Sequence, residues 1–398
     1  MRSPARRIRA LIPATVLAAG LLAASPAHSA DRPDVRLAHA DTAVSGSWIV
    51  VLKDTAPSSV RPAAQSLADR YDSLTHVYSS SLRGFSVKAS AAQAQRLASD
   101  PRVAYVEQDS RVALSATQSN ATWGLDRIDQ RQLPLDTSYT YNTTASNVSI
   151  YVIDTGVRTA HQEFGGRAVI GTDAVGDGQN GNDCNGHGTH VAGTTAGSTY
   201  GVAKGARIVG VRVLNCQGSG TTSGVVAGID WVTANAVKPA VANMSLGGGA
   251  STSLDDAVKR SVASGVSYAV AAGNGNAGGK AQNACNYSPA RVPEAITVGA
   301  TDNTDTKASW SNYGTCLDLF APGVGITSSW STSDTATNTI SGTSMATPHV
   351  AGVAALYLSG HPSATPAQVR DAMVAATTSA VVKSAGNGSP NKLLYSIF

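Results

Sequence analysis

Apolar runs alternate with helical stretches along most of the chain. Near-continuous runs of apolar residues, bounded by glycine or polar positions, are typical of strands buried on both faces. These runs are 148–153, 208–214, 265–272 and 295–300, and helical candidates lie between them at 222–234 and 254–264. The alternation predicts an α/β fold with a mostly parallel central sheet and helices on both faces.

A shorter pattern occupies residues from about 46 to 113. Strand runs at 48–52, 84–87 and 103–106 alternate with helical spacing at 58–71 and 90–99. The second helix is expected to begin after Ser90 and to stop before Pro101. The pattern predicts a separate small α+β domain of the split βαβ, ferredoxin-like type. Residues 114–120 are small and polar, as expected of a linker.

The first thirty residues have the pattern of a secretory signal peptide. Four arginines come first, then the apolar stretch 11–24, then small residues, with cleavage expected near Ala27 or Ala30. A membrane anchor is the alternative, but the apolar stretch is too short to span a bilayer, and no other is longer. We therefore expect a secreted, extracellular protein with no membrane segment after cleavage.

Removal of this leader changes the charge balance. The formal net charge is +4, and residues 1–30 contain four arginines and no acidic residue, so the remainder is neutral overall. It shows no basic stripe, which argues against nucleic-acid binding. The chain has four cysteines, and an even number in a secreted protein favours disulfides. Spacing alone leaves three pairings open among Cys184, Cys216, Cys285 and Cys316.

Ser344 is a candidate nucleophile. It lies in a Gly-Thr-Ser-Met-Ala-Thr-Pro-His motif just before the helix-forming segment 350–358, with Pro348 expected in the first turn of that helix. Backbone N–H groups at a helix N-terminus stabilise developing negative charge. A helix cap is the alternative for an isolated serine. The motif does not fit the hydrolase nucleophile elbow, because Ala346 stands where glycine is needed.

Two polar side chains follow apolar runs, where the carboxyl ends of parallel strands gather ligands. Asp154 comes directly after 148–153; its alternatives are a turn cap or half of an aspartic-protease dyad. No second Asp-Thr-Gly or Asp-Ser-Gly occurs, which argues against the dyad. Asn274 follows 265–272, and its amide can donate to an oxyanion. Its alternative is a turn asparagine, since Asn-Gly is a common turn pair.

His187 is the candidate general base. Glycines on both sides present its imidazole at the start of a small-residue helix, and histidine is the natural base near neutral pH. Zinc binding with Cys184 and His190 is the alternative. It is disfavoured because zinc needs further ligands and Cys184 is expected to be oxidised in a secreted protein. His190 is expected to be structural.

Taken together, these residues supply the parts of a nucleophilic hydrolysis. Ser344 attacks, His187 takes and returns its proton, and Asp154 orients the imidazole and stabilises its charged form. Asn274 and the N–H of Ser344 then bind the oxyanion. No catalytic cofactor is required.

The motifs resemble those of the subtilisin-like serine proteases, and within them the proteinase K group with its aqualysin-type secreted enzymes. They are Asp-Thr-Gly at 154–156, Gly-His-Gly-Thr-His at 186–190, Ala-Ala-Gly-Asn at 271–274 and Gly-Thr-Ser-Met-Ala-Thr-Pro-His at 342–349. The resemblance covers about residue 116 to the C-terminus and implies a catalytic domain at 116–398 after the leader 1–30. It implies that 31–115, with its domain at about 46–113, is an inhibitory propeptide that the enzyme removes near 115–116.

The resemblance also implies the substrate site. We expect both walls of the pocket that receives the side chain before the scissile bond, and an edge that pairs with the peptide main chain. The residues are Gly218, Ser219, Gly220, Ser245, Leu246, Gly247, Gly248, Ala271 and Gly273. A flexible loop is the alternative for the glycine run. We see no acid placed to select Lys or Arg, so we expect broad endopeptidase activity that favours apolar or aromatic residues, by a monomer acting on protein substrates.

Structural calcium and the disulfide pairing come from the same resemblance. One loop site is implied at Asp126, Asp129, Gln130, Asp136 and Ser138, and a second at Asp318 with the carbonyls of Pro293 and Ala295. Oxygen ligands of this kind suit calcium, and a solvated acidic loop is the alternative. The implied disulfides are 184–216 and 285–316. Two other functions are alternatives. A catalytically inactive binding relative is disfavoured by the complete set of Asp154, His187, Ser344 and Asn274 and by the propeptide. A serine esterase of another fold is disfavoured by the position of Ala346 and by the order of the motifs.

Overall fold

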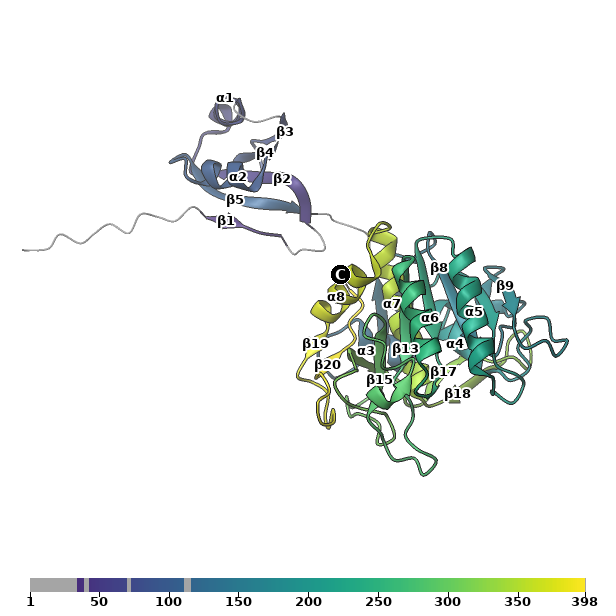
Figure 1. The fold of residues 1–398 in the computed structure, drawn as a ribbon. Helices are drawn as coiled ribbons and strands as arrows, with labels where there is room; N and C mark the ends of the chain where they lie inside the picture. Colours follow the sequence, from purple (N-terminus) through teal and green to yellow (C-terminus); the bar gives the residue numbers. More distant parts are fainter. Residues whose placement is uncertain (1–33, 39–42, 70–72, 111–115, 398) are drawn as a thin grey trace, which may run out of the picture. The chain divides into compact units, whose positions relative to one another are not determined.

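A computed structural model describes residues 34–38, 43–69, 73–110 and 116–397. The chain forms two compact units, residues 1–111 and 112–398, which are described separately (Figure 1). The predicted leader at 1–30 lies outside the described residues. Within the part that is described, no helix is long and apolar enough to cross a bilayer.

In its described residues, the smaller unit is an α+β sandwich of five strands and two helices. The strands lie in the order β1-β5-β2-β4-β3, and the apolar faces of both helices cover the sheet. The elements are β1 (Val35–Arg36), β2 (Ala43–Leu52), α1 (Pro57–Ala68), β3 (Ser73–Tyr78), β4 (Gly84–Lys88), α2 (Ala91–Ala98) and β5 (Val103–Ser110). Strand β3 was not predicted, because a register shift between Leu74 and His76 interrupts its alternation.

The larger unit is built on a nine-stranded sheet in the order β19-β20-β16-β15-β13-β11-β8-β10-β9. All neighbours pair in parallel except β19 with β20. Its strands are β8 (Ser149–Asp154), β9 (Ala168–Asp173), β10 (Arg207–Arg212), β11 (Ala240–Met244), β13 (Val266–Ala271), β15 (Ile296–Thr301), β16 (Leu319–Pro322), β19 (Thr378–Ser379) and β20 (Lys392–Leu393). The predicted α/β class and parallel sheet are confirmed.

Helices bury both faces of this sheet. The side chains of Ile150 and Val152 pack with α3 (Trp123–Ile128), α4 (His187–Ala196), α7 (Thr343–Gly360) and α8 (Pro366–Ala376). Those of Tyr151 and Ile153 pack on the other face with α5 (Thr222–Asn235) and α6 (Thr252–Ala263). This explains the apolar runs seen in the sequence, since consecutive residues of a strand face opposite layers.

Short elements complete the larger unit. Three two-stranded ribbons pair β6 with β7, β12 with β14 and β17 with β18. They are β6 (Ala116–Ser119), β7 (Ser138–Tyr141), β12 (Gly248–Gly249), β14 (Tyr287–Ser288), β17 (Ile326–Ser329) and β18 (Thr337–Ile340), with 3-10 turns η1 (Gln162–Phe164) and η2 (Ala284–Asn286). Residues 116–119 were predicted as linker; that was wrong, because main-chain pairing with β7 orders this polar, largely exposed segment.

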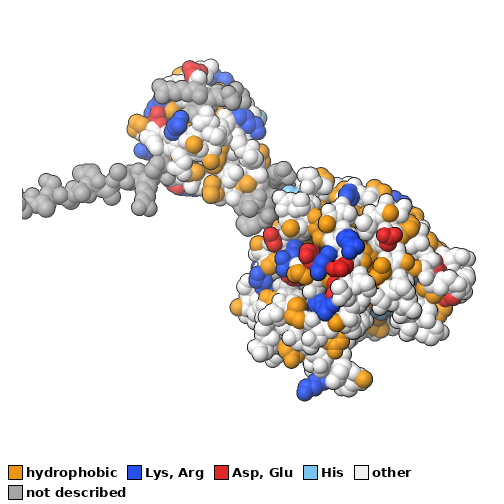
Figure 2. Space-filling model, in the orientation of Figure 1, with side chains coloured by type: hydrophobic (Ala, Val, Ile, Leu, Met, Phe, Trp, Pro, Cys, Tyr) orange, Lys and Arg blue, Asp and Glu red, His pale blue; other side chains and the backbone are white. Residues whose placement is uncertain are grey.

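The helix after Ser344 also differs from its prediction. It begins at Thr343, so Pro348 lies inside it and not in its first turn. Figure 2 shows that, on one face of the larger unit, positive and negative side chains are intermingled in a largely uncharged surface.

Candidate active site

Asp154 and His187 come together at the carboxyl end of the sheet. Asp154 is the last residue of β8 and is fully buried, and His187 is the first residue of α4. The Nδ1 of His187 lies 2.8 Å from the Oδ1 of Asp154, and the backbone N–H of Thr155 donates to the same oxygen at 2.7 Å. The carboxylate therefore fixes the imidazole ring and leaves its Nε2 directed away from Asp154.

Glycines beside His187 are required by close packing. Gly186, the residue before α4, has a φ of 113°, which an L side chain rarely adopts. A Cβ at Gly188 would collide with the carbonyl oxygen of Gly156. These two positions let the start of α4 approach the end of β8 closely enough for the contact between His187 and Asp154.

The surroundings of His187 favour its protonated form. Burial lowers the pKa of the imidazole, but the charge and hydrogen bond of Asp154 and the charge of Asp183 outweigh it, so the pKa is raised above 6.5. His190, one turn further along α4, is buried, and burial lowers its pKa to about 4. Its Nε2 lies 3.0 Å from the carbonyl of Ile326, as a structural histidine would.

Ser344 and Ser245 hold each other through reciprocal hydrogen bonds. The Oγ of Ser344 donates to the carbonyl of Ser245 at 3.0 Å, and the Oγ of Ser245 donates to the carbonyl of Ser344 at 2.8 Å. In a regular helix the N–H of residue 348 would occupy that second carbonyl. Pro348 has no N–H, so the hydroxyl of Ser245 replaces it. The carbonyl of Ser344 is thereby satisfied where α7 continues through Pro348.

The side chain of Asn274 is oriented by Thr343. The Oδ1 of Asn274 accepts from the N–H and from the Oγ1 of Thr343, each at 2.8 Å. The amide oxygen is thereby held toward Thr343, and its Nδ2 remains as the donor on the Ser344 side. Sequence reasoning did not identify Thr343, although it directly precedes Ser344 in the motif.

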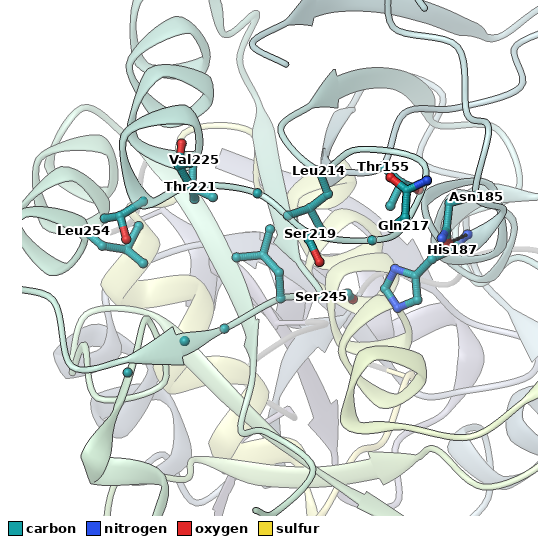
Figure 3. A pocket seen from close by; sticks show the side chains of 17 residues that line it. Thr155, Asn185, His187, Leu214, Gln217, Ser219, Thr221, Val225, Ser245 and Leu254 are labelled. Atoms are coloured by element: carbon teal, nitrogen blue, oxygen red, sulfur yellow. Dashed lines mark hydrogen bonds between the residues drawn. The ribbon is translucent and has the colours of Figure 1, made fainter. Parts of the chain in front are cut away.

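A cleft of about 580 Å³ runs from His187 along the glycine-rich segments. In Figure 3, His187 and Asn185 stand at one end, Val225 and Leu254 at the other, and Ser245 lies between them. A second cavity of about 250 Å³ adjoins Ser344 and Asn274. All the residues predicted for substrate binding line one or both cavities: Gly218, Ser219, Gly220, Ser245, Leu246, Gly247, Gly248, Ala271 and Gly273.

The smaller cavity is uncharged. Among the described residues that line it, none carries an acidic or basic side chain, and Tyr287, Ala290 and the glycine segments form its walls. Such a cavity accepts an apolar side chain without leaving a buried charge unpaired.

Comparison with known proteins identifies the larger unit. Residues 145–393 match the subtilase family, and residues 27–115 match the peptidase inhibitor I9 family. The chain belongs to the subtilase family of serine proteases. The extracellular serine proteinase of Thermus sp. strain Rt41A is 54% identical over 94% of this chain and 95% of its own length. The alkaline serine exoprotease A of Vibrio alginolyticus is 52% identical over 91% of this chain and 69% of its own length.

A solved structure agrees with this membership. The crystal structure of a cold adapted subtilisin-like serine proteinase is 58% identical, with a TM-score of 0.67, over 70% of this chain and all of the solved chain. An inhibitor I9 domain followed by a subtilase domain is thus the organisation of this protein.

Both disulfides of the subtilase unit are as predicted. Cys184 pairs with Cys216 and Cys285 with Cys316. The first pair closes the loop before His187 onto the segment after β10. Because Cys184 is bonded to Cys216, the zinc alternative at Cys184, His187 and His190 is wrong.

The loop before β7 gathers oxygen donors. Burial and the charges of Asp136 and Asp126 raise the pKa of Asp129 to about 6, partly offset by the N–H of Thr140. Both carboxylate oxygens of Asp126 accept backbone N–H groups, and Asp136 accepts from Ser138. Like charges held together in this way suit a cation.

The carboxylates of this loop do not by themselves form a complete cation site. Among the described residues, no group of three or more His, Cys, Asp or Glu side chains is arranged to hold a metal ion. A cation there would also need the Gln130 amide oxygen, the Ser138 hydroxyl or backbone carbonyls.

The second predicted metal site does not fit a cation. The Oδ1 of Asp318 accepts from the Nε and Nη2 of Arg370 at 2.9 and 2.6 Å. Its Oδ2 accepts from the N–H of Thr297 at 2.8 Å. A guanidinium thus already supplies a positive charge at the Asp318 carboxylate, the side chain of the site implied with the carbonyls of Pro293 and Ala295. The motif could not reveal this, because Arg370 lies on α8, far along the chain.

Proposed function

We propose that this chain is a secreted serine endopeptidase of broad specificity, made as an inactive precursor. The observation that carries the proposal is the contact between buried Asp154 and His187, at the mouth of a cleft whose adjoining cavity holds Ser344 and Asn274. The relatives named extracellular serine proteinase and alkaline serine exoprotease A support the serine-protease part of this proposal, and the first also supports secretion.

Acylation begins at the hydroxyl of Ser344. Its Oγ rotates from the carbonyl of Ser245 toward the Nε2 of His187, transfers its proton, and attacks the substrate carbonyl. Asp154 stabilises the imidazolium through the Nδ1 contact of 2.8 Å. His187 then returns the proton to the leaving amine, and water enters by the same steps in reverse to release the acid.

The negative charge of the tetrahedral intermediate falls between two donors. One is the Nδ2 of Asn274, oriented by Thr343. The other is the backbone N–H of Ser344 in the first turn of α7, where helical N–H groups have no partner within the helix. Fixed donors of this type stabilise the transition state without reorganising.

Substrate selection follows from the cleft. The segments at 218–220 and 246–248 offer main-chain groups to an extended peptide, which every protein sequence can present. The uncharged cavity of about 250 Å³ favours an apolar or aromatic side chain before the scissile bond. An open cleft of this kind suits cleavage within chains.

The inhibitor I9 domain is proposed to act on its own subtilase unit. It would occupy the cleft, assist folding and be cut off near 115–116, leaving residues 116–398 as the enzyme. The leader at 1–30 directs secretion. Parallel sheets depend on non-local contacts and fold slowly, which gives the propeptide a physical role. We propose that the mature enzyme is a monomer.

A structural calcium ion is proposed for the loop before β7 only. Asp126, Asp129, Gln130, Asp136 and Ser138 would hold it, and its charge would neutralise the clustered carboxylates. The catalytic steps above do not involve it.

Two serines in one motif allow a matched test of the function. Ser344→Ala should abolish cleavage of an internally placed bond in a peptide blocked at both ends, and the secreted protein should keep its propeptide by intact mass. Ser341→Ala, an exposed neighbour, should mature and cleave normally. A Ser344→Ala protein that matures and cleaves like wild type, with other proteases excluded, would disprove the nucleophile. An inactive wild type would support the binding-protein alternative.

A further inference from the structure

Asp183 is a buried carboxylate that sequence reasoning did not single out. It lies four residues before His187 and is 8% exposed. Its Oδ1 accepts from the Oγ1 of Thr155 at 2.9 Å and from the N–H groups of Asn185 and Gly186 at 3.0 and 2.8 Å. Its Oδ2 accepts from the N–H and Oγ1 of Thr189 at 2.8 and 2.6 Å. These contacts use the whole accepting capacity of the carboxylate.

These donors come from both sides of the catalytic pair. Thr155 directly follows Asp154, and Thr189 lies in the first turn of α4, two residues after His187. The Oγ1 of Thr155 also accepts from the N–H of Gly188 at 2.9 Å. Asp183 and Thr155 therefore tie the end of β8 to the start of α4, which are the two elements that carry Asp154 and His187.

Every donor to Asp183 is neutral. The nearby acids Asp173 and Asp177 instead form ion pairs with the buried guanidinium of Arg212. Within the described residues, no ion pair involves Asp183. Hydrogen-bond dipoles keep its charge in place but do not cancel it, so its negative charge still favours the protonated form of His187.

We propose that Asp183 is a positioning residue of the catalytic centre, which holds α4 against Asp154 and stabilises the imidazolium formed when His187 accepts the proton of Ser344. The inference rests on the proposed protease function. It gives the site two buried carboxylates with separate tasks. Asp154 contacts the imidazole, whereas Asp183 acts through Thr155, Thr189 and its charge.

The charged groups around His187 determine its pKa, which the pH dependence of activity would measure. Asp154 on β8 and Asp183 in the preceding loop both favour imidazolium. His190 on α4 has its pKa lowered to about 4 by burial, so it is neutral where the enzyme would work. Arg212 on β10 contacts Cys184 at 3.5 Å, but its single positive charge is more than balanced by the two carboxylates of Asp173 and Asp177. Removal of the charge of Asp183 alone should lower the pKa of His187.

The test is the pH dependence of kcat/KM for Asp183→Asn on a blocked peptide substrate. We expect the acid limb to move several tenths of a pH unit lower, and kcat to fall about tenfold while KM changes less than about twofold. Asp302→Asn is the matched control. Asp302 also accepts several donors within its own turn, from Thr304 and Thr306, but has no contact with the catalytic pair. It should leave both the limb and kcat unchanged.

A second pair of variants covers a failure of Asp183→Asn to mature. Thr155→Val removes the hydroxyl that joins the end of β8 to Asp183 and to the N–H of Gly188 in α4, and Thr155→Ser keeps it. We expect kcat to fall about tenfold in the first and to stay within about twofold of wild type in the second. An acid limb unmoved by Asp183→Asn, or a Thr155→Val enzyme as fast as wild type, would overturn the inference. An inactive wild type would instead refute the proposed function.

Discussion

At the residue scale, the active site depends on side chains that orient other side chains. Asn274 points its amide nitrogen at the Ser344 side because Thr343 donates twice to its oxygen. Ser344 lies in a helix that continues past Pro348, and Ser245 satisfies the carbonyl that Pro348 leaves free. The motifs name the residues that we propose to react, whereas these partners are visible only when distant segments are brought together.

Thr343 provides a test of this orientation. In Thr343→Val the amide of Asn274 loses one of its two donors and can turn away from the oxyanion. We expect kcat to fall about tenfold with KM changed less than about twofold, because the donor acts only in the transition state. Thr343→Ser keeps the hydroxyl and should retain activity. Equal kcat values for the Val and Ser variants would contradict this role.

The pH dependence of activity follows from His187. A general base must be neutral, and negative neighbours raise its pKa above 6.5. Activity should therefore be full at alkaline pH and be lost as pH falls through a midpoint above 6.5. The measurement is kcat/KM against pH, with the enzyme returned to pH 8 afterward to exclude unfolding. A midpoint below 6.5 would show that the carboxylates do not act on His187 as described.

At the element scale, the prediction was most accurate for strands that are mostly apolar and for a helix whose apolar residues recur at helical spacing. The strands at 149–154 and 266–271 and the helix at 222–235 lie within two residues of their predicted bounds. The central strand β11 was not predicted, because five residues that include Asn243 give a weak signal beside longer runs. Its place between β8 and β13 depends on pairing that no local pattern encodes.

Substitution of Asp129, in the loop before β7, should have opposite effects on Tm with and without calcium. At pH 8 Asp129 is ionised although its pKa is raised to about 6, so without metal this charge destabilises the fold, and the cost disappears as pH falls below 6. In EDTA, Asp129→Asn should raise Tm by a few degrees, on the order of 1 kcal/mol after screening. With calcium present it should lower Tm instead.

Thermal unfolding of the inhibitor-blocked enzyme measures this reversal. Blocking prevents self-digestion during the scan. If Asp129→Asn lowered Tm equally in EDTA and in calcium, the loop would not be a calcium site. Asp318→Asn provides the comparison, because its partner is Arg370; its effect on Tm should not depend on calcium.

The two disulfides are expected to differ in their effect on activity. Each closes a loop of similar length, with separations of 32 and 31 residues, so each should contribute roughly 3–4 kcal/mol to stability. Only Cys184–Cys216 braces the loop that carries Asp183 and leads to His187. The double Ser variant of that pair should lose both heat resistance and kcat, whereas the variant of Cys285 and Cys316 should lose heat resistance alone.

Verified reduction of the wild-type enzyme tests the shared part of this prediction. The melting temperature should fall by several degrees. An unchanged Tm after complete reduction, confirmed by thiol titration, would contradict the stabilising role of both bonds.

At the scale of the whole molecule, the organisation could be read from the sequence because each part has a distinct pattern. An inhibitor domain precedes a subtilase domain, and both match known families. The second calcium site could not be judged in the same way. Its ligands were transferred by resemblance, and Arg370 reaches Asp318 from a helix far along the chain. A motif reports the residues it contains but not the partner that folding brings to them.

The central claim is that His187, held by Asp154, activates Ser344 alone among the serines of the chain. The most direct measurement is mass spectrometry of the mature enzyme after reaction with a phosphonyl fluoride, on the intact protein and on its peptides. The same reaction is followed in Asp154→Asn. That variant is first matured with added wild-type enzyme, which is then removed. We expect one adduct, on the peptide containing Ser344, formed much more slowly in the variant. Labelling spread over several serines, or equally fast in Asp154→Asn, would contradict it.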